Sequence, residues 1–369
     1  MRICYIAFGG SIHTKRWVDY FAVKGHDVHL ITPERVCANF IEGVKIHPLK
    51  GLGPRIGVKA YLINAIPFLV QTKALVKRIQ PHLVHAHYIM GPALLGALSG
   101  VHPLVLTAWG SDVSYLTEVS KIRKWTVKLA LTRADLITCD AEHIRRTLVG
   151  LGADPKTIAT VGFGTDTRNF SPKKRSESIR TRLGIFNSPA VISRRFLEPL
   201  YDVESLINAI PLVLREVPDA KFVIAASGPQ EGELRELAKS LGVTESIRFI
   251  GGIDDKDFPE YIASADIYVS TSLSDAGISA STAEAMSCGL PVITTDFGDN
   301  GRWIINRRNG FLVPLRDPRM LAQKIIWLAN NEDTRKRFGR INRAIIKKRN
   351  DYCMEMEKME HLYMTLVDL

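Results

Sequence analysis

The sequence has no long apolar run. None of its 369 residues lies in a stretch of the roughly 20 apolar residues that a membrane-spanning helix requires. The longest apolar segment, residues 60–70, is interpreted as a buried or surface-lying helix. The start of the chain leads directly into an apolar strand pattern without the features of a signal peptide. These absences predict a cytoplasmic protein.

Cysteine is scarce, and its distribution excludes two further classes. An odd number of scattered cysteines argues against a disulfide framework and favours a reducing compartment. None of them has a histidine or a second cysteine at metal-ligand spacing. We therefore expect no metal and no other cofactor. The five cysteines are Cys4, Cys37, Cys139, Cys288 and Cys353.

Two motifs that define large functional classes are also absent. The first apolar strand ends in Gly9-Gly10-Ser11 and not in the GxGxxG of dinucleotide-binding proteins, so a nicotinamide site is weakly supported. No DNA- or RNA-binding motif accompanies the basic residues, and we expect no nucleic-acid partner.

Positive charge is present in excess and is unevenly distributed. The net charge is +11; residues 1–165 hold 20 Lys and Arg against 10 Asp and Glu, and the remaining residues hold 29 against 28. Basic residues alternate with apolar ones in residues 50–80 and again in residues 121–128. This pattern is typical of a helix on an anionic membrane surface, although a solvated basic surface or a phosphate-bearing acceptor would also account for it.

Apolar strand patterns alternate with helical patterns along the chain, which predicts an α/β fold with two doubly wound, Rossmann-like domains. We expect the first domain in residues 1–165 and the second in residues 189–349. The polar stretch 166–188 is interpreted as the linker. The C-terminal helix, residues 350–369, is expected to pack back on the first domain, with a coiled-coil dimer arm as the alternative.

Residues 270–298 have the pattern strand, loop, helix, strand. The loop holds Asp275 and Gly277, and Glu284 lies in the first turns of the helix. In open α/β sheets, ligands bind where a strand ends and the next helix begins, because backbone N–H groups converge there. A glycine in such a loop lets the backbone approach a ligand closely.

This stretch resembles the donor-site signature of retaining glycosyltransferases of family four, which have the GT-B fold. Glu284, Ala285-Met286 and Gly289-Leu290-Pro291-Val292 match the second half of that signature. The first acidic position of the family is Ala276 here, and Asp275 is the nearest substitute. Looser matches lie in residues 11–18, 162–172 and 190–203.

The resemblance implies two Rossmann-like domains that face a central cleft. It also implies transfer of a sugar from a nucleotide-sugar, UDP-linked, to a hydroxyl of a glycan or lipid-linked acceptor with retention of configuration. The donor's own phosphate would act as the base, and no metal is required. Cell-envelope polysaccharide or glycoconjugate synthesis at the inner face of the membrane is the expected setting.

The resemblance assigns roles on the donor side. Glu284 holds the ribose, Asp275 binds sugar hydroxyls, and Arg195 neutralises phosphate, assisted by Arg194. Tyr201 stands where the family has a second cation, a lysine. The backbone positions expected to contact the nucleotide-sugar are Gly10, Gly228, Gly252, Ile253, Gly277, Ile278 and Ser279.

Polar and aromatic residues at two strand ends of the first domain are the acceptor-side candidates. They are His87, Trp109 and Asp112. Relatives have a histidine where Trp109 stands; a tryptophan can stack on a sugar or wall the cleft, but it cannot move a proton. Plain core packing is the alternative for Trp109, and a satisfied strand-end side chain is the alternative for His87.

Three other functions stay open at this point. A noncatalytic relative that binds a nucleotide-sugar is compatible with Ala276, Tyr201 and Trp109. A Rossmann-type NAD-dependent oxidoreductase would also have paired βαβ units, and an epimerase or phosphorylase could use the same scaffold.

Overall fold

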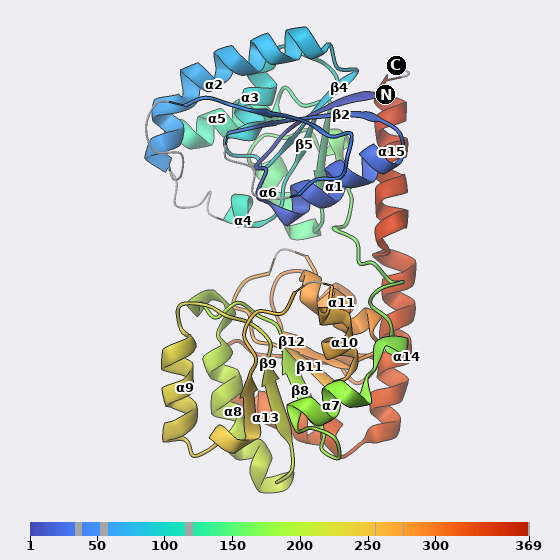
Figure 1. The fold of residues 1–369 in the computed structure, drawn as a ribbon. Coiled ribbons are helices and arrows are strands. Elements are labelled where there is room, and N and C mark those ends of the chain that lie inside the picture. Colours follow the sequence, from blue (N-terminus) through green and yellow to red (C-terminus); the bar gives the residue numbers. More distant parts are fainter. Residues whose placement is uncertain (34–38, 52–57, 115–120, 255, 276, 368–369) are drawn as a thin grey trace. The chain divides into compact units, whose positions relative to one another are not determined.

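The computed structural model describes residues 1–369 except 34–38, 52–57, 115–120, 255, 276 and 368–369. The chain divides into two compact units (Figure 1). The first comprises Met1–Phe163 and Glu355–Leu369, and the second comprises Gly164–Met354. The chain therefore passes from one unit to the other twice.

The first unit is built on a seven-stranded parallel sheet in the order β3-β2-β1-β4-β5-β6-β7. Its central strands are buried on both faces, as expected for apolar runs between helices. The strands are β1 (Arg2–Ile6), β2 (Asp27–Thr32), β3 (Lys45–Pro48), β4 (Leu83–His87), β5 (Leu104–Thr107), β6 (Leu136–Cys139) and β7 (Ile158–Thr160).

Helices cover both faces of this sheet (Figure 1). They are α1 (Ile12–Val23), α2 (Val58–Ile79), α3 (Pro92–Ser99), α4 (Ser111–Ser114), α5 (Lys121–Leu131) and α6 (Glu142–Gly150). The last helix of the chain, α15 (Tyr352–Val367), joins them from Glu355 onward. Its buried Tyr363 hydroxyl lies 3.1 Å from the Tyr5 hydroxyl and also hydrogen-bonds His85, which anchors the helix to β1 and β4.

The second unit is built on a six-stranded parallel sheet in the order β10-β9-β8-β11-β12-β13. The strands are β8 (Ala190–Ser193), β9 (Lys221–Ile224), β10 (Ile247–Phe249), β11 (Ile267–Ser270), β12 (Val292–Thr295) and β13 (Gly310–Val313). The helices are α7 (Glu177–Leu183), α8 (Val203–Glu216), α9 (Glu231–Ser240), α10 (Phe258–Ala263), α11 (Ala280–Ser287), α12 (Asn300–Trp303), α13 (Pro318–Ala329) and α14 (Glu332–Arg349).

The stretch 166–188, predicted to be a linker, lies inside the second unit. It contains α7, whose Ile179 and Leu183 are buried in the core of that unit together with Phe170. Glu177 and Arg182 are exposed, whereas Arg180 is buried and pairs with Asp266, and the apolar pair at positions i and i+4 faces inward. The polar composition therefore concealed a packed element.

Among the residues that the structure describes, no helix is long and apolar enough to cross a membrane.

Candidate active site

In the second unit, the predicted donor-side residues lie at the carboxyl ends of two neighbouring strands. Arg194 and Arg195 follow β8 directly, and Asp275 lies in the loop between β11 and α11. β8 and β11 are paired in parallel, so the segments that follow them leave the same edge of the sheet. Residues 80 or more positions apart in the sequence are thereby brought into contact.

Arg195 and Asp275 form a buried ion pair. The two side chains are 8% and 7% exposed, and Nη2 donates to Oδ1 of Asp275 at 2.6 Å. Nη1 of Arg195 donates to Oγ of Ser281 at 3.4 Å, and its guanidinium lies 4.6 Å from the Tyr201 ring. Burial raises the pKa of the Asp275 carboxyl, and the charge of Arg195 opposes that shift.

Tyr201 thus has a definite place although it replaces a lysine of the family pattern. Its ring faces the guanidinium of Arg195, an attraction between a cation and the negative face of an aromatic ring. Tyr201 therefore helps to hold Arg195 in place, although it supplies no positive charge of its own.

Arg194 and Glu284 form a second pair beside the first. Nη1 of Arg194 donates to Oε2 of Glu284 at 3.1 Å, with side chains 25% and 14% exposed. The guanidinium also lies 3.8 Å from the Phe258 ring. Because Arg194 and Glu284 are more exposed than Arg195 and Asp275, they are the more accessible pair to a ligand.

The amino end of α11 reaches the same edge of the sheet. Ser279 is the N-cap, and its hydroxyl accepts from the backbone N–H of Thr282 at 3.3 Å. Gly277 and Ile278 precede it, and Gly277 is buried. Unpaired N–H groups of a helix start favour an anion. Ala276, the departure from the family pattern, lies outside the described residues.

Gly228 brings the loop after β9 against the segment after β8. A Cβ at this position would lie 2.5 Å from the carbonyl oxygen of Leu197, so only glycine fits there. Gly252 and Ile253 follow β10. A Cβ on Gly252 would meet nothing closer than Oγ of Ser227 at 3.7 Å, so its backbone is open to an approaching ligand.

In the first unit, Asp112 holds two loop ends together. Its carboxylate accepts from the backbone N–H of Ile89 at 2.8 Å and from that of Trp109 at 3.0 Å. It thereby links the segments after β4 and β5. Burial raises the pKa of Asp112 to about 6, against the opposing effect of the amide donors. The carboxylate thereby fixes the two segments relative to each other at this edge of the sheet.

His87 and Trp109 lie in an aromatic cluster at the ends of β4 and β5. Their ring centroids are 5.5 Å apart, and the Trp17 ring meets both edge-on. His87 is fully buried, and neither of its ring nitrogens has a hydrogen-bond partner among the described residues. Burial lowers the pKa of His87 to about 3. Gly10, another predicted residue, is exposed in the turn between β1 and α1.

His13 belongs to this cluster and was not among the predicted residues. It lies in the first turn of α1, and its ring is stacked on Trp109 with centroids 4.5 Å apart and 19° between the planes. A lone histidine in a helix carries little information by itself. The available signal in the sequence was its position three residues after Gly10. A glycine turn after a strand places the first turn of the next helix at the edge of the sheet, where ligands bind.

Comparisons with known proteins agree with this architecture. A family model described as "Glycosyl transferases group 1" matches residues 176–344, and one described as "Glycosyl transferase 4-like" matches residues 2–141. The crystal structure of Anabaena HepE in complex with UDP matches with a TM-score of 0.84 at 17% identity, covering 99% of this chain and 100% of that chain. Sucrose-phosphate synthase from Thermosynechococcus elongatus matches with a TM-score of 0.84 at 19% identity, covering 99% of each chain.

This chain belongs to the GT-B glycosyltransferases of group 1.

Sequence relatives of this glycosyltransferase are also described as glycosyltransferases. The GDP-mannose-dependent alpha-(1-6)-phosphatidylinositol monomannoside mannosyltransferase of Mycolicibacterium smegmatis is 25% identical over 277 residues, 68% of this chain and 72% of that protein. An uncharacterized glycosyltransferase of Methanocaldococcus jannaschii is 27% identical over 353 residues, 94% of this chain and 92% of that protein. The protein is an enzyme that uses a sugar donor and an acceptor, and the α/β fold prediction is confirmed.

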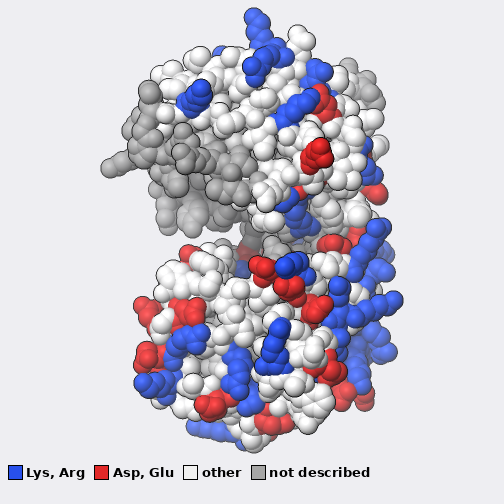
Figure 2. All heavy atoms as spheres, viewed as in Figure 1, with Lys and Arg blue, Asp and Glu red and all other residues white. Residues whose placement is uncertain are grey.

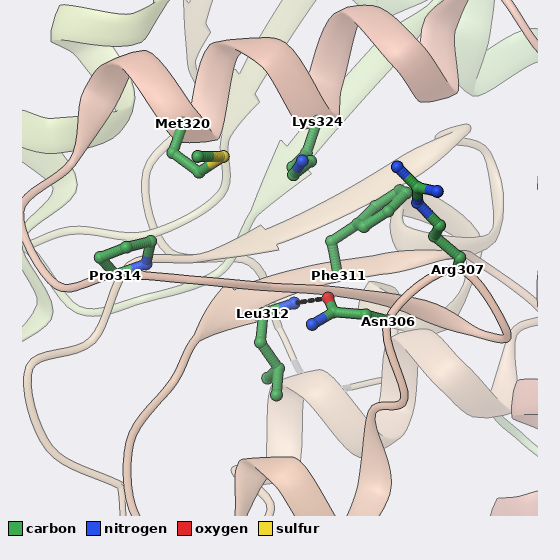
Figure 3. Close-up of a pocket in the computed structure, with 7 residues that line it drawn as sticks. All are labelled: Asn306, Arg307, Phe311, Leu312, Pro314, Met320 and Lys324. Carbon is green, nitrogen blue, oxygen red and sulfur yellow. Dashed lines mark hydrogen bonds between the residues drawn. The ribbon is translucent and has the colours of Figure 1, made fainter.

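A cavity elsewhere in the second unit of the glycosyltransferase contains none of the predicted residues. It has a volume of about 270 Å³ and lies between β13 and α13 (Figure 3). Phe311 and Met320 supply apolar surface, and Arg307 and Lys324 are its cations. The full lining is Asn306, Arg307, Phe311, Leu312, Pro314, Met320 and Lys324.

Basic residues also gather on one part of the surface of the second unit. Figure 2 shows Lys and Arg gathered along the side of the second unit where α14 runs. The count for this half of the chain is nearly neutral because acidic residues elsewhere in the unit balance the helix. The exposed cations of α14 are Lys336, Arg337, Arg340, Lys347, Lys348 and Arg349.

Proposed function

We propose that this glycosyltransferase moves a hexosyl group from a UDP-sugar to a hydroxyl of a glycan or lipid-linked acceptor, with retention of configuration. The proposed setting is cell-envelope polysaccharide or glycoconjugate synthesis, at the inner face of the membrane. The observation that carries the donor part is the paired arrangement of Arg195 with Asp275 and Arg194 with Glu284 at one sheet edge.

A diphosphate leaving group needs fixed positive charge, and Arg195 supplies it. Cleavage of the sugar–phosphate bond leaves negative charge on the nucleoside diphosphate, which preorganised cations and amides stabilise. Arg195 is held by Asp275, Ser281 and Tyr201, so its position costs little reorganisation. Its Nε is buried and has no hydrogen-bond partner among the described residues.

Retention is proposed because the carboxylates of the donor site are engaged in ion pairs. Asp275 and Glu284 each accept from an arginine, so both carboxylates have a role in holding a cation, and the proposal assigns the acceptor proton to the donor. In the proposed reaction a donor phosphate oxygen takes the acceptor proton as the acceptor oxygen bonds to the anomeric carbon on the face that the phosphate leaves. Glu284 is proposed to bind the ribose hydroxyls.

The choice of UDP as the nucleotide follows from similar solved structures, and GDP is the competing nucleotide. HepE was solved with UDP and with UDP-glucose, whereas the mannosyltransferase of M. smegmatis is GDP-mannose-dependent. Gly252 and Ile253 are the proposed base contacts through their backbone groups. Backbone contacts discriminate between bases by geometry, so a binding measurement decides between a UDP-sugar and a GDP-sugar.

A ligand screen tests the donor proposal. Thermal shifts of the wild type and of Glu284→Ala are measured with UDP-, GDP- and ADP-sugars, and Glu233→Ala, an exposed glutamate on α9, is the control. Ligand at 100 times its Kd stabilises the native state by about 2.7 kcal/mol. We expect the largest shift with a UDP-sugar, its loss in Glu284→Ala and its persistence in Glu233→Ala. A shift that Glu284→Ala leaves intact removes Glu284 from the site.

A turnover assay separates catalysis from simple binding. Release of nucleoside diphosphate from the bound donor is expected, and the anomeric configuration of the product, read by NMR, should equal that of the donor. Binding without any release favours a noncatalytic nucleotide-sugar-binding protein. Inversion at the anomeric carbon contradicts the retaining mechanism.

Membrane contact is proposed for the outer sides of α2 and α5. Ile66 and Val70 on α2 are 75% and 62% exposed, and Ile122 and Trp125 on α5 are 72% and 63% exposed. Both helices pack against α3, so they cover the same face of the sheet. The exposed cations beside these apolar side chains are Lys73, Lys77, Arg78, Lys121, Lys124 and Lys128. Apolar side chains surrounded by lysines suit an anionic lipid surface.

Vesicle flotation tests this contact. The wild type is expected to float with phosphatidylglycerol-containing vesicles and to stay in solution with phosphatidylcholine alone. The double variant Ile122→Ser/Trp125→Ser should reduce flotation, whereas Phe186→Ser, which removes an exposed aromatic ring of the second unit, should not. Equal flotation with both lipids contradicts the electrostatic part of the proposal.

A further inference from the structure

The ring of His13 is held in one orientation by its neighbours. One face of the imidazole is stacked on Trp109, and the Phe163 ring meets it edge-on with centroids 4.5 Å apart. The guanidinium of Arg16 lies 3.9 Å from the Phe163 ring and fixes that ring in turn. A histidine packed in this way loses little further conformational freedom when it binds a ligand.

The two nitrogens of His13 have different environments. In the part of the chain that the structure describes, neither nitrogen has a hydrogen-bond partner; Nδ1 is buried, whereas Nε2 is not among the buried atoms. The ring therefore keeps one polar atom that is not fully buried, close to the ends of β1, β4 and β5. In open α/β sheets, ligands bind at this edge.

A second observation at the same place points to a ligand. His87, 5.5 Å from Trp109 by ring centroids, is fully buried, and no described residue hydrogen-bonds its two ring nitrogens or Nε1 of Trp109. Buried polar groups are nearly always satisfied in folded proteins, and exceptions concentrate where function requires them. The structure gathers several such groups around His13.

The cluster is suited to a neutral, hydroxyl-rich ligand. Burial, with a smaller contribution from the charge of Arg16, lowers the pKa of His13 to about 4, so its imidazole is neutral at physiological pH. A neutral imidazole hydrogen-bonds a hydroxyl as donor or acceptor, whereas it gives a phosphate no charge. His13 also covers a face of Trp109, so that face cannot stack on a sugar, and the polar edge of His13 is presented instead.

We propose that Nε2 of His13, held by its stack on Trp109, binds a hydroxyl of a sugar ring. This inference rests on the proposed function and names a further ligand contact for it. The sugar is either the one being transferred or one that belongs to the acceptor, and the two sources are separable by experiment.

Binding measurements distinguish the two sources. Isothermal titration of UDP-glucose against UDP, and of GDP-mannose against GDP, gives the affinity that the donor sugar adds. Octyl α-D-glucopyranoside and octyl α-D-mannopyranoside serve as acceptor probes, read through nucleoside diphosphate release. Loss of one neutral hydrogen bond lowers affinity about threefold to tenfold. The variant His13→Phe should reduce either the affinity added by the donor sugar or the response to the octyl glycosides by this factor, with affinity for the bare nucleotide unchanged.

Three substitutions separate ligand binding from packing. His13→Phe keeps a ring against Trp109 but removes both nitrogens, His13→Gln places an amide near the position of Nε2, and His13→Asn places one near Nδ1. Ligand binding through Nε2 predicts that His13→Gln retains more activity than His13→Phe or His13→Asn. Packing alone predicts the reverse order for His13→Gln and His13→Phe. His361→Phe, at an exposed position of α15, is the matched control and should behave as wild type.

The outcomes are distinguishable. If the wild type binds nucleotide but His13→Phe matches it for every sugar and glycoside, the His13 inference is overturned and the proposed function stands. If the wild type binds none of these ligands, the proposed function is overturned and the His13 inference with it.

Discussion

The second unit presents charged side chains at the carboxyl edge of its sheet, whereas the first unit presents aromatic rings at the corresponding edge. At the ends of β8 and β11, two arginines are paired with two carboxylates within 3.1 Å. At the ends of β4 and β5, His87 and Trp109 have buried nitrogens without partners. The same parallel topology thus creates one edge suited to a diphosphate and one suited to neutral hydroxyl groups. The chemistry of each edge comes from the few residues that follow its strands.

The largest expected effect comes from breaking the buried pair of the second unit. Arg195→Met leaves Asp275 without its cation in a site that is 7% exposed, and removing one partner of a buried pair costs about 3–5 kcal/mol. Urea unfolding should show this loss, and Arg195→Met/Asp275→Leu should recover much of it. Arg235→Met, which breaks an exposed pair with Glu231, should change stability by less than about 1 kcal/mol. Equal losses in both single variants would contradict the burial argument.

The buried carboxylate of the first unit is expected to give a pH-dependent effect. The folded pKa of Asp112 is about 6, above its ordinary value of 3.8, so its contribution to stability is present at low pH and is lost as pH rises toward 6. Relative to Asp112→Asn, the wild type should therefore lose up to about 3 kcal/mol of stability between pH 4 and pH 7. Urea unfolding at several pH values measures it. The exposed Asp219→Asn should show no such trend.

Removing the unsatisfied nitrogens of the first unit should stabilise the protein. His87→Phe replaces a fully buried imidazole without hydrogen bonds by a ring of similar size, and we expect a gain of about 1–2 kcal/mol. The folded pKa of His87 is about 3, so the unfolded state alone binds a proton as pH falls below 6.5. The gain should consequently be larger at pH 5 than at pH 7.5. A loss of stability at both pH values would show that His87 has a partner in solution.

The smallest effect on stability is expected at the proposed base contact. Gly252→Ala adds a Cβ with no neighbour closer than 3.7 Å. The free energy of unfolding should therefore change by less than about 0.5 kcal/mol, while the affinity for the nucleotide falls. Gly228→Ala is the contrasting variant, because its Cβ would lie 2.5 Å from the Leu197 carbonyl oxygen and must distort the loop. Unchanged nucleotide affinity in Gly252→Ala would move the base contact elsewhere.

The pattern of residues 270–298 was sufficient to place Asp275 and Glu284 on a loop and a helix after a strand, and the structure has them there. It did not indicate that each acid is paired with an arginine from the segment after β8. His13 was missed for a similar reason, because its stack on Trp109 joins residues that are far apart in the chain. The interpretation of 166–188 as a linker failed because composition hides the inward side of a short helix.

Apolar periodicity and glycine turns, which depend on neighbours in the chain, determined the alternating strands and helices. The likeness to glycosyltransferases came from the motif residues Glu284, Ala285-Met286 and 289–292. Only the tertiary structure decided which side chains are ionised in pairs and which are buried without partners. Ionisation and hydrogen bonding depend on the exclusion of solvent and on the distance between atoms. Parallel strand pairing determines both, because it brings together and buries segments that are far apart in the sequence.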